Sequence, residues 1–181
     1  HVDLHIIVFG SHMLFELGNT REVVKAEFPQ TYEVHTLLAG NTNESMTDSV
    51  GFGISKLTSL FQLIKPHVVV VHGDRFDAFS AAIAANMLNY TIAHLEGGEL
   101  SGTVDGTLRH AISKLSHVHF TCTYEAQRRV RAMGELPSTV HLTGCPSYDN
   151  LFSLSSTNSW VELEVAKIVE HAEVQIKPRA Y

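Results

Sequence analysis

The chain has 181 residues, of which 44% are hydrophobic and 18% charged, and its 19 acidic and 13 basic side chains give a formal charge of -6. This composition predicts a folded domain of ordinary size and excludes a disordered acidic segment. The negative charge argues against a binder of nucleic acid, and the apolar runs are far shorter than the about 20 residues that span a membrane. With two cysteines and no visible secretory signal, we expect a cytoplasmic protein without a disulfide framework.

Short β-branched runs alternate along the chain with longer stretches of helical period. The predicted strands cover residues 4–9, 32–38, 67–72, 91–95, 118–122 and 139–142. The predicted helices cover residues 12–28, 45–64, 77–88, 104–115 and 124–133. The continuously apolar run from Val68 to Val71 is typical of a parallel strand that helices bury on both faces. The sequence therefore predicts an α/β fold with a doubly wound parallel sheet.

Two of the predicted strands are followed by similar polar motifs. The run HGDR ends with Asp74 and Arg75, and the run HLEGGE contains Glu96, Gly97 and Gly98. Each motif has a histidine and, two positions later, a carboxylate beside glycine. A single Asp after a strand is more commonly a helix cap. Because ligands of such sheets bind at the carboxyl ends of the strands, the joint pattern favours an acid/base site that contains Asp74 and Glu96.

A third carboxylate follows in the next polar loop. This loop runs from Leu100 to Gly106 and enters a helix whose apolar stripe leaves Asp105 at the N-terminal end, facing the same edge of the sheet. Asp105 and Arg109 are four positions apart, and His110 follows.

Other polar groups carry weaker signals. A zinc site built from His110, His117, His119 and Cys122 matches no compact zinc spacing, so we expect no metal. Both cysteines are interpreted as structural rather than nucleophilic. The turn at residues 144–147 is a weak candidate for an anion site, and the alanine-rich segment 78–85 is interpreted as a core helix.

The strings VVVVHGDRFDAFSAA, IAHLEGGELSGTVDGTLRHAISKLSH and LTGCPSYDNL resemble, in this order, the hydrolysing UDP-N-acetylglucosamine 2-epimerase family of sialic acid biosynthesis. The stretch FGSHMLFELGNTREVV is also similar, so the resemblance covers residues 1–153. It implies the Rossmann-like N-terminal half of a glycosyltransferase-B type two-domain fold, with the active site between the domains. It also implies a UDP-sugar substrate, a homo-oligomer and no nicotinamide or other cofactor.

The reaction implied by the resemblance converts UDP-N-acetylglucosamine and water to N-acetylmannosamine and UDP. UDP is eliminated to leave 2-acetamidoglucal, and water then adds with inversion at carbon 2. Position by position, Asp74, Glu96 and Asp105 match the acid/base groups of the family. We expect Asp74 and Asp105 to act in the elimination and Glu96 in the hydration. The expected substrate-binding residues are Arg75, Gly97, Gly98, Ser101, Gly102, Thr103, Arg109 and His110.

The sequence also departs from the family. Gly106 stands where relatives often have a second acid, and residues 154–181 do not resemble what should follow, although 160–172 read as an amphipathic helix. The family's opening strand and its second domain are absent, so we expect the chain to be incomplete. Two alternatives stay open, namely an epimerase for a related UDP-diacetamido sugar and a non-catalytic assembly domain of the same fold.

Overall fold

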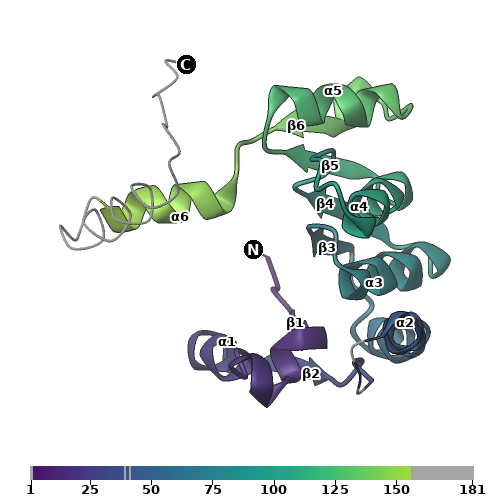
Figure 1. The fold of residues 1–181 in the computed structure, drawn as a ribbon, viewed down its shortest axis with the longest axis vertical. Coiled ribbons are helices and arrows are strands. Elements are labelled where there is room, and N and C mark those ends of the chain that lie inside the picture. Colours follow the sequence, from purple (N-terminus) through teal and green to yellow (C-terminus); the bar gives the residue numbers. More distant parts are fainter. Residues whose placement is uncertain (1, 39, 41, 156–181) are drawn as a thin grey trace. The chain divides into compact units, whose positions relative to one another are not determined.

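The computed structural model describes residues 2–38, 40 and 42–155 (Figure 1). It divides the chain into two compact units, residues 1–143 and residues 144–181. All of the predicted site residues belong to the first unit.

The first unit begins with a pair of parallel strands, β1 (Ile6–Phe9) and β2 (Thr31–Val34). The connection between them contains two short 3-10 helices, η1 (Gly10–Met13) and η2 (Phe15–Leu17), and the α-helix α1 (Arg21–Glu27). The prediction of one continuous helix over residues 12–28 was therefore wrong. Gly18 and Asn19 have φ angles of 88° and 45°, and this left-handed backbone ends a right-handed helix.

A second sheet of four parallel strands follows, and its strand order is the order along the chain. The strands are β3 (Val68–His72), β4 (Thr91–Leu95), β5 (Val118–Thr121) and β6 (Val140–Leu142). Helix α2 (Asn43–Ile64) precedes β3. The strands are connected by α3 (Phe76–Met87), α4 (Val104–Leu115) and α5 (Tyr124–Ala132). The short 3-10 helix η3 (Pro137–Thr139) lies directly before β6. This arrangement confirms the α/β fold class and brings the carboxyl ends of β3 and β4 to the same edge.

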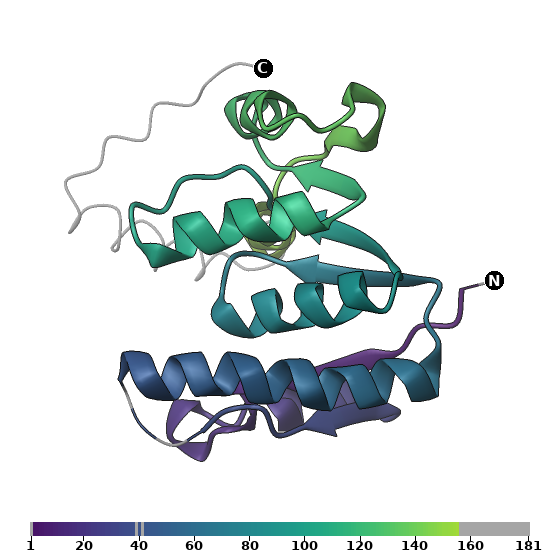
Figure 2. The same cartoon turned by 90° about the vertical axis from the view of Figure 1, so that its right-hand side faces the viewer.

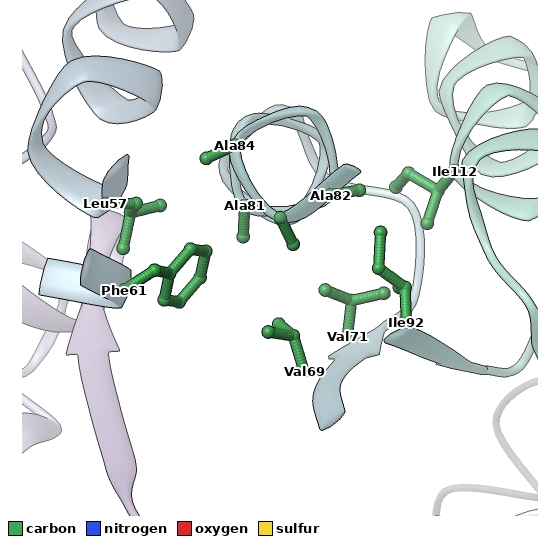
Figure 3. Close-up of a cluster of buried hydrophobic side chains, with 10 residues drawn as sticks. Leu57, Phe61, Val69, Val71, Ala81, Ala82, Ala84, Ile92 and Ile112 are labelled. Carbon is green, nitrogen blue, oxygen red and sulfur yellow. The ribbon is translucent and has the colours of Figure 1, made fainter. Parts of the chain in front are cut away.

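Helices α2 to α5 lie on one side of the strands, as the two views in Figures 1 and 2 show. Helix α1 lies on the other side of the β1–β2 pair (Figure 1). The main core is formed where α2 and α3 meet β3 and β4, and it contains Phe61, Val71 and Ile92 (Figure 3). The predicted core helix is confirmed, because four buried alanines of α3 allow the close approach of its neighbours, namely Ala81, Ala82, Ala84 and Ala85.

Strand β3 differs from the prediction in one respect. Val69 and Val71 are buried, but Val68 and Val70 are 49% and 61% exposed. In the part of the chain that the structure describes, the run is therefore buried on one face only. The physical reason is that α2, α3 and α4 pack against the face that carries Val69 and Val71.

The second unit contains α6 (Pro146–Ser155). The amphipathic helix expected at 160–172 lies outside the described residues. No helix within the described ranges is long and apolar enough to cross a membrane.

Candidate active site

Asp74 lies in the turn between β3 and α3. Strand β3 ends at His72, and Gly73 takes a left-handed conformation with φ of 76°, which turns the chain at Asp74 toward the start of α3. The Asp74 carboxylate accepts a hydrogen bond from Nη2 of Arg109 on α4. The two side chains are only 17% and 11% exposed, so this ion pair is largely removed from solvent.

Glu96 follows β4 and lies beside this ion pair. Its backbone has a φ of 62°, which is unusual for a residue with a side chain, and its N–H donates to the Phe120 carbonyl at 2.9 Å. The Glu96 carbonyl accepts from Nη1 of Arg109 at 2.9 Å. One guanidinium therefore connects the ends of β3 and β4. Oε1 of Glu96 also lies 3.1 Å from Nε2 of His72.

Asp105 lies in the first turn of α4, four positions before Arg109. The N-cap of this helix is Thr103, whose Oγ1 accepts from the Asp105 N–H at 3.3 Å and lies 3.3 Å from Oδ2 of Asp105. The predicted helix start after Gly102 is confirmed. Asp105 and Arg109 lie on the same side of α4 because four residues make about one turn. The third carboxylate therefore lies one turn away from the Asp74–Arg109 pair.

The glycines after Glu96 are enclosed rather than open to a ligand. A Cβ atom on Gly98, which has a φ of 83°, would overlap the Ala126 carbonyl of α5. A Cβ atom on Gly97 would lie 3.0 Å from both Nδ1 of His94 and Oγ of Ser113. The structure thus gives both glycines a packing role, and their predicted contacts with substrate stay predictions.

The polar loop before α4 is exposed. Ser101, Gly102 and Thr103 all lie at the surface, and nothing in the described structure crowds a side chain at Gly102. Gly106 differs, because a Cβ atom there would lie 3.3 Å from Oγ of Ser101. An acidic residue at position 106 would therefore press against Ser101.

Arg75 and His110 are placed differently from each other. Nε of Arg75 lies 3.4 Å from Oδ1 of Asp77, and the guanidinium stacks over the Phe76 ring at 5.5 Å. Arg75 is therefore turned toward the start of α3. Nδ1 of His110 is buried and has no hydrogen-bond partner among the described residues.

The sequence did not predict the contacts of His94, which lies in the same region. It is fully buried on β4, where Nε2 lies 2.8 Å from the Gly73 carbonyl and Nδ1 lies 3.0 Å from Oγ of Ser113 on α4. Burial lowers the pKa of His94 to about 4. The available sequence signal is its place on the same face of β4 as the core residue Ile92.

Two of the histidines considered as zinc ligands, His117 and His119, lie at β5, whereas His110 lies on α4. Nδ1 of His117 accepts a hydrogen bond from the Ile92 N–H at 3.1 Å. His119 is fully buried on β5, and its burial lowers the pKa of its imidazole.

The chain is similar to known proteins of one family. Residues 1–178 match the family described as UDP-N-acetylglucosamine 2-epimerase. A UDP-N-acetylglucosamine 2-epimerase of Neisseria meningitidis serogroup B is 38% identical over 84% of this chain and 40% of its own length. A hydrolysing UDP-N,N'-diacetylbacillosamine 2-epimerase of Legionella pneumophila is 40% identical over 86% of this chain and 42% of its own length.

A crystal structure titled UDP-GlcNAc 2-epimerase from Neisseria meningitidis bound to UDP-GlcNAc superposes with a TM-score of 0.69 at 21% identity. The match covers 92% of this chain and 46% of that one, and it confirms the Rossmann-like fold of the glycosyltransferase-B type. The chain spans about 40% of the length of the curated relatives it matches. From its motifs, its fold and these similarities, the chain belongs to the UDP-N-acetylglucosamine 2-epimerase family.

Proposed function

We propose that the protein in its complete natural form is a hydrolysing epimerase that converts UDP-N-acetylglucosamine and water to N-acetylmannosamine and UDP. The observation that carries this proposal is the junction at Arg109. Its guanidinium binds the Asp74 carboxylate and the Glu96 carbonyl, and Asp105 lies one turn earlier on the same helix. The Asp74 side chain and the Glu96 backbone are thus connected through one guanidinium, and Asp105 follows on the helix that carries it, which supports a set of acid/base groups for proton transfers on a sugar ring.

The proposed reaction has two steps. In the first, Asp74 and Asp105 act in the elimination, in which the C2 proton and UDP leave the sugar and a C1–C2 double bond forms. In the second, Glu96 acts in the hydration, in which C2 gains a proton on the opposite face and C1 gains the hydroxyl of water. His72 supports Glu96 in this scheme, since its Nε2 lies within hydrogen-bond distance of the carboxylate and can pass a proton to or from it.

Two features support the binding of an anionic substrate by a protein whose chain has a formal charge of -6. Arg75 is 56% exposed beside the Asp74 turn, so its guanidinium is accessible to a diphosphate. The exposed loop of Ser101, Gly102 and Thr103 ends at the N-terminus of α4, where backbone N–H groups favour anions and polar oxygens. On this basis we propose that Arg75, Ser101, Gly102 and Thr103 bind the substrate, whereas the roles expected for Gly97, Gly98, Arg109 and His110 stay predictions.

The test follows UDP release from UDP-N-acetylglucosamine by the protein in its complete natural form. We expect N-acetylmannosamine as the second product, deuterium at its C2 when the reaction is run in D2O, and no solvent oxygen in UDP, because C1–O cleavage leaves that oxygen on the nucleotide. Asp74→Asn, Glu96→Gln and Asp105→Asn should each lower kcat at least about 100-fold. Asp48→Asn is the control, because Asp48 is exposed on α2.

A UDP-diacetamido sugar is the second candidate substrate, favoured by the 40% identity to the hydrolysing epimerase of Legionella pneumophila. Comparison of kcat/KM for UDP-N-acetylglucosamine and UDP-N,N'-diacetylbacillosamine separates the two, because the substrates differ at the sugar ring and not at the nucleotide. Release of UDP from neither sugar would refute the enzymatic proposal and leave the non-catalytic assembly domain.

A further inference from the structure

His94 is enclosed between the turn that carries Asp74 and the helix that carries Arg109. Its side chain is fully buried, so substrate does not touch it. The carbonyl of Gly73 can only accept a hydrogen bond, so Nε2 of His94 carries the proton at this 2.8 Å contact. Nδ1 is then the acceptor of the neutral ring, and the hydroxyl of Ser113 donates to it at 3.0 Å.

These contacts tie together the two segments that form the Asp74–Arg109 pair. Gly73 immediately precedes Asp74 in the chain, so the imidazole holds the backbone of the turn. Ser113 lies one turn after Arg109 on α4, and it is fully buried. His94 therefore bridges the same two elements as the ion pair, from the interior side of the sheet edge.

The space around the imidazole is closed on the remaining side. A Cβ atom on Gly97 would lie 3.0 Å from Nδ1 and 3.4 Å from Cε1 of His94. Even a methyl group would therefore press on the ring. On its other side Gly73 donates its N–H to the Leu95 carbonyl at 3.1 Å, so the backbone of the turn is bound to β4 through both its N–H and its carbonyl.

We propose that His94, together with Ser113, is a positioning residue that sets the location of Asp74 relative to Arg109 and Asp105. This inference rests on the proposed function. It goes beyond that function in assigning a role to a buried imidazole that neither donates a proton to the substrate nor contacts it. The physical basis is that misplacement of a reacting group by about 1 Å can cost about 100-fold in rate.

The test compares His94→Leu, which removes both hydrogen bonds, with His94→Gln, whose amide N–H can still donate to the Gly73 carbonyl. We expect His94→Leu to lower kcat for UDP release about 30- to 100-fold while KM changes less than about 2-fold. His94→Gln should recover most of the lost kcat. Ser113→Ala should lower kcat about 3- to 10-fold in the natural sequence and have no further effect when His94 is Leu.

A second measurement separates positioning from a general loss of stability. With substrate deuterated at C2, the isotope effect on kcat should rise in His94→Leu, because a misplaced Asp74 makes removal of this hydrogen slower. Ile92→Val is the matched control, since Ile92 is fully buried two positions earlier on β4 and its truncation lowers Tm without touching either hydrogen bond. It should leave kcat and the isotope effect unchanged.

The outcomes distinguish the two proposals. If the natural protein releases UDP and His94→Leu retains its kcat and isotope effect at temperatures where it is folded, the positioning role is refuted and the proposed function stands. A loss of kcat equal to that of Ile92→Val at the same loss of Tm would also refute it. If the natural protein releases no UDP from either sugar, both proposals fail together.

Discussion

The guanidinium of Arg109 and the carboxylate of Asp74 form an ion pair between residues 35 positions apart in the chain. The same guanidinium holds the backbone of Glu96. Arg109 thus connects the carboxyl ends of β3 and β4, where Asp74 and Glu96 lie. Substitution of Arg109 tests how much this connection contributes.

Arg109→Met should lower both stability and activity. The substitution leaves the Asp74 carboxylate, which is 17% exposed, without its cationic partner, and we expect the free energy of unfolding to fall by about 2–3 kcal/mol. Urea denaturation measures this loss. The free energy of unfolding of Arg109→Lys should lie between those of Arg109→Met and the natural sequence. The reason is that one ammonium cannot bind both acceptors with the geometry of a guanidinium. Equal stability of Arg109→Met and the natural sequence would show that the pair adds nothing to folding.

Gly98→Ala should be far more destabilising than Gly134→Ala. Both glycines have left-handed backbone, with φ of 83° and 97°, so both substitutions cost about 1–2 kcal/mol in backbone strain. Only at Gly98 would the new methyl group also overlap the Ala126 carbonyl and a methyl group of Val130, whereas the space around Gly134 is open in the described structure. We expect an additional loss of at least about 2 kcal/mol for Gly98→Ala, measured by urea denaturation. Similar losses for the two variants would contradict the packing of Gly98 against α5.

Stability should fall in mild acid because of His94. The pKa of this buried imidazole is about 4, whereas a histidine of the unfolded chain titrates near pH ~6.5. Between the two pKa values, the imidazole of the unfolded chain is protonated and that of the folded chain is neutral. The free energy of unfolding therefore decreases as pH falls from ~6.5 to about 4. The total loss is about 3 kcal/mol, and the contribution of His94 is fully retained above pH ~7.

Urea denaturation at several pH values checks this dependence against His94→Gln, which lacks the titrating group. His119, whose pKa burial also lowers, contributes with the same sign in both proteins and cancels in the comparison. Two parallel curves between pH 7.5 and 4.5 would mean that His94 titrates normally.

Substitution of valine by threonine should change the free energy of unfolding differently on the two faces of β3. Threonine has the shape of valine and favours strands equally well, so the comparison isolates the burial of the hydroxyl. Val71 is 5% exposed, and Val71→Thr buries a hydroxyl at a cost of about 1–3 kcal/mol. Val70 is 61% exposed, and Val70→Thr should change the free energy of unfolding of the 181-residue chain by less than about 0.5 kcal/mol. A large loss for Val70→Thr would show that this face is covered.

The sequence predicted the second sheet well because its signals are local. Strands β3 and β4 are short, mainly apolar runs that end at turns, and the helices between the strands have clear periods. The segment 12–28 was harder, since its apolar residues have helical spacing. The break at Gly18 and Asn19 depends on backbone angles that the pattern does not show.

The grouping of acidic residues could be predicted from topology, because parallel strands end at the same edge of a sheet. The hydrogen-bond partners of these residues could not be predicted from the sequence. Asp74 meets Arg109 and His94 meets Gly73 and Ser113 through contacts between different elements, and nothing in the local sequence indicates a separation of 19 to 35 positions. Likewise, the packing of Gly97 and Gly98 against neighbours on α4 and α5 could not be predicted from the sequence, because these contacts form only in three dimensions.

The division of the strands into two sheets affects how this polypeptide should behave when it is produced alone. Among the described residues, β1 is hydrogen-bonded to β2 only and β3 to β4 only, so each has one side whose N–H and C=O groups pair with no other strand. Such edges add strands from other molecules, most readily where the exposed face is as apolar as that of Val68 and Val70. Purification of the isolated 181-residue chain should therefore be limited by self-association through β3 rather than by failure of the core to fold.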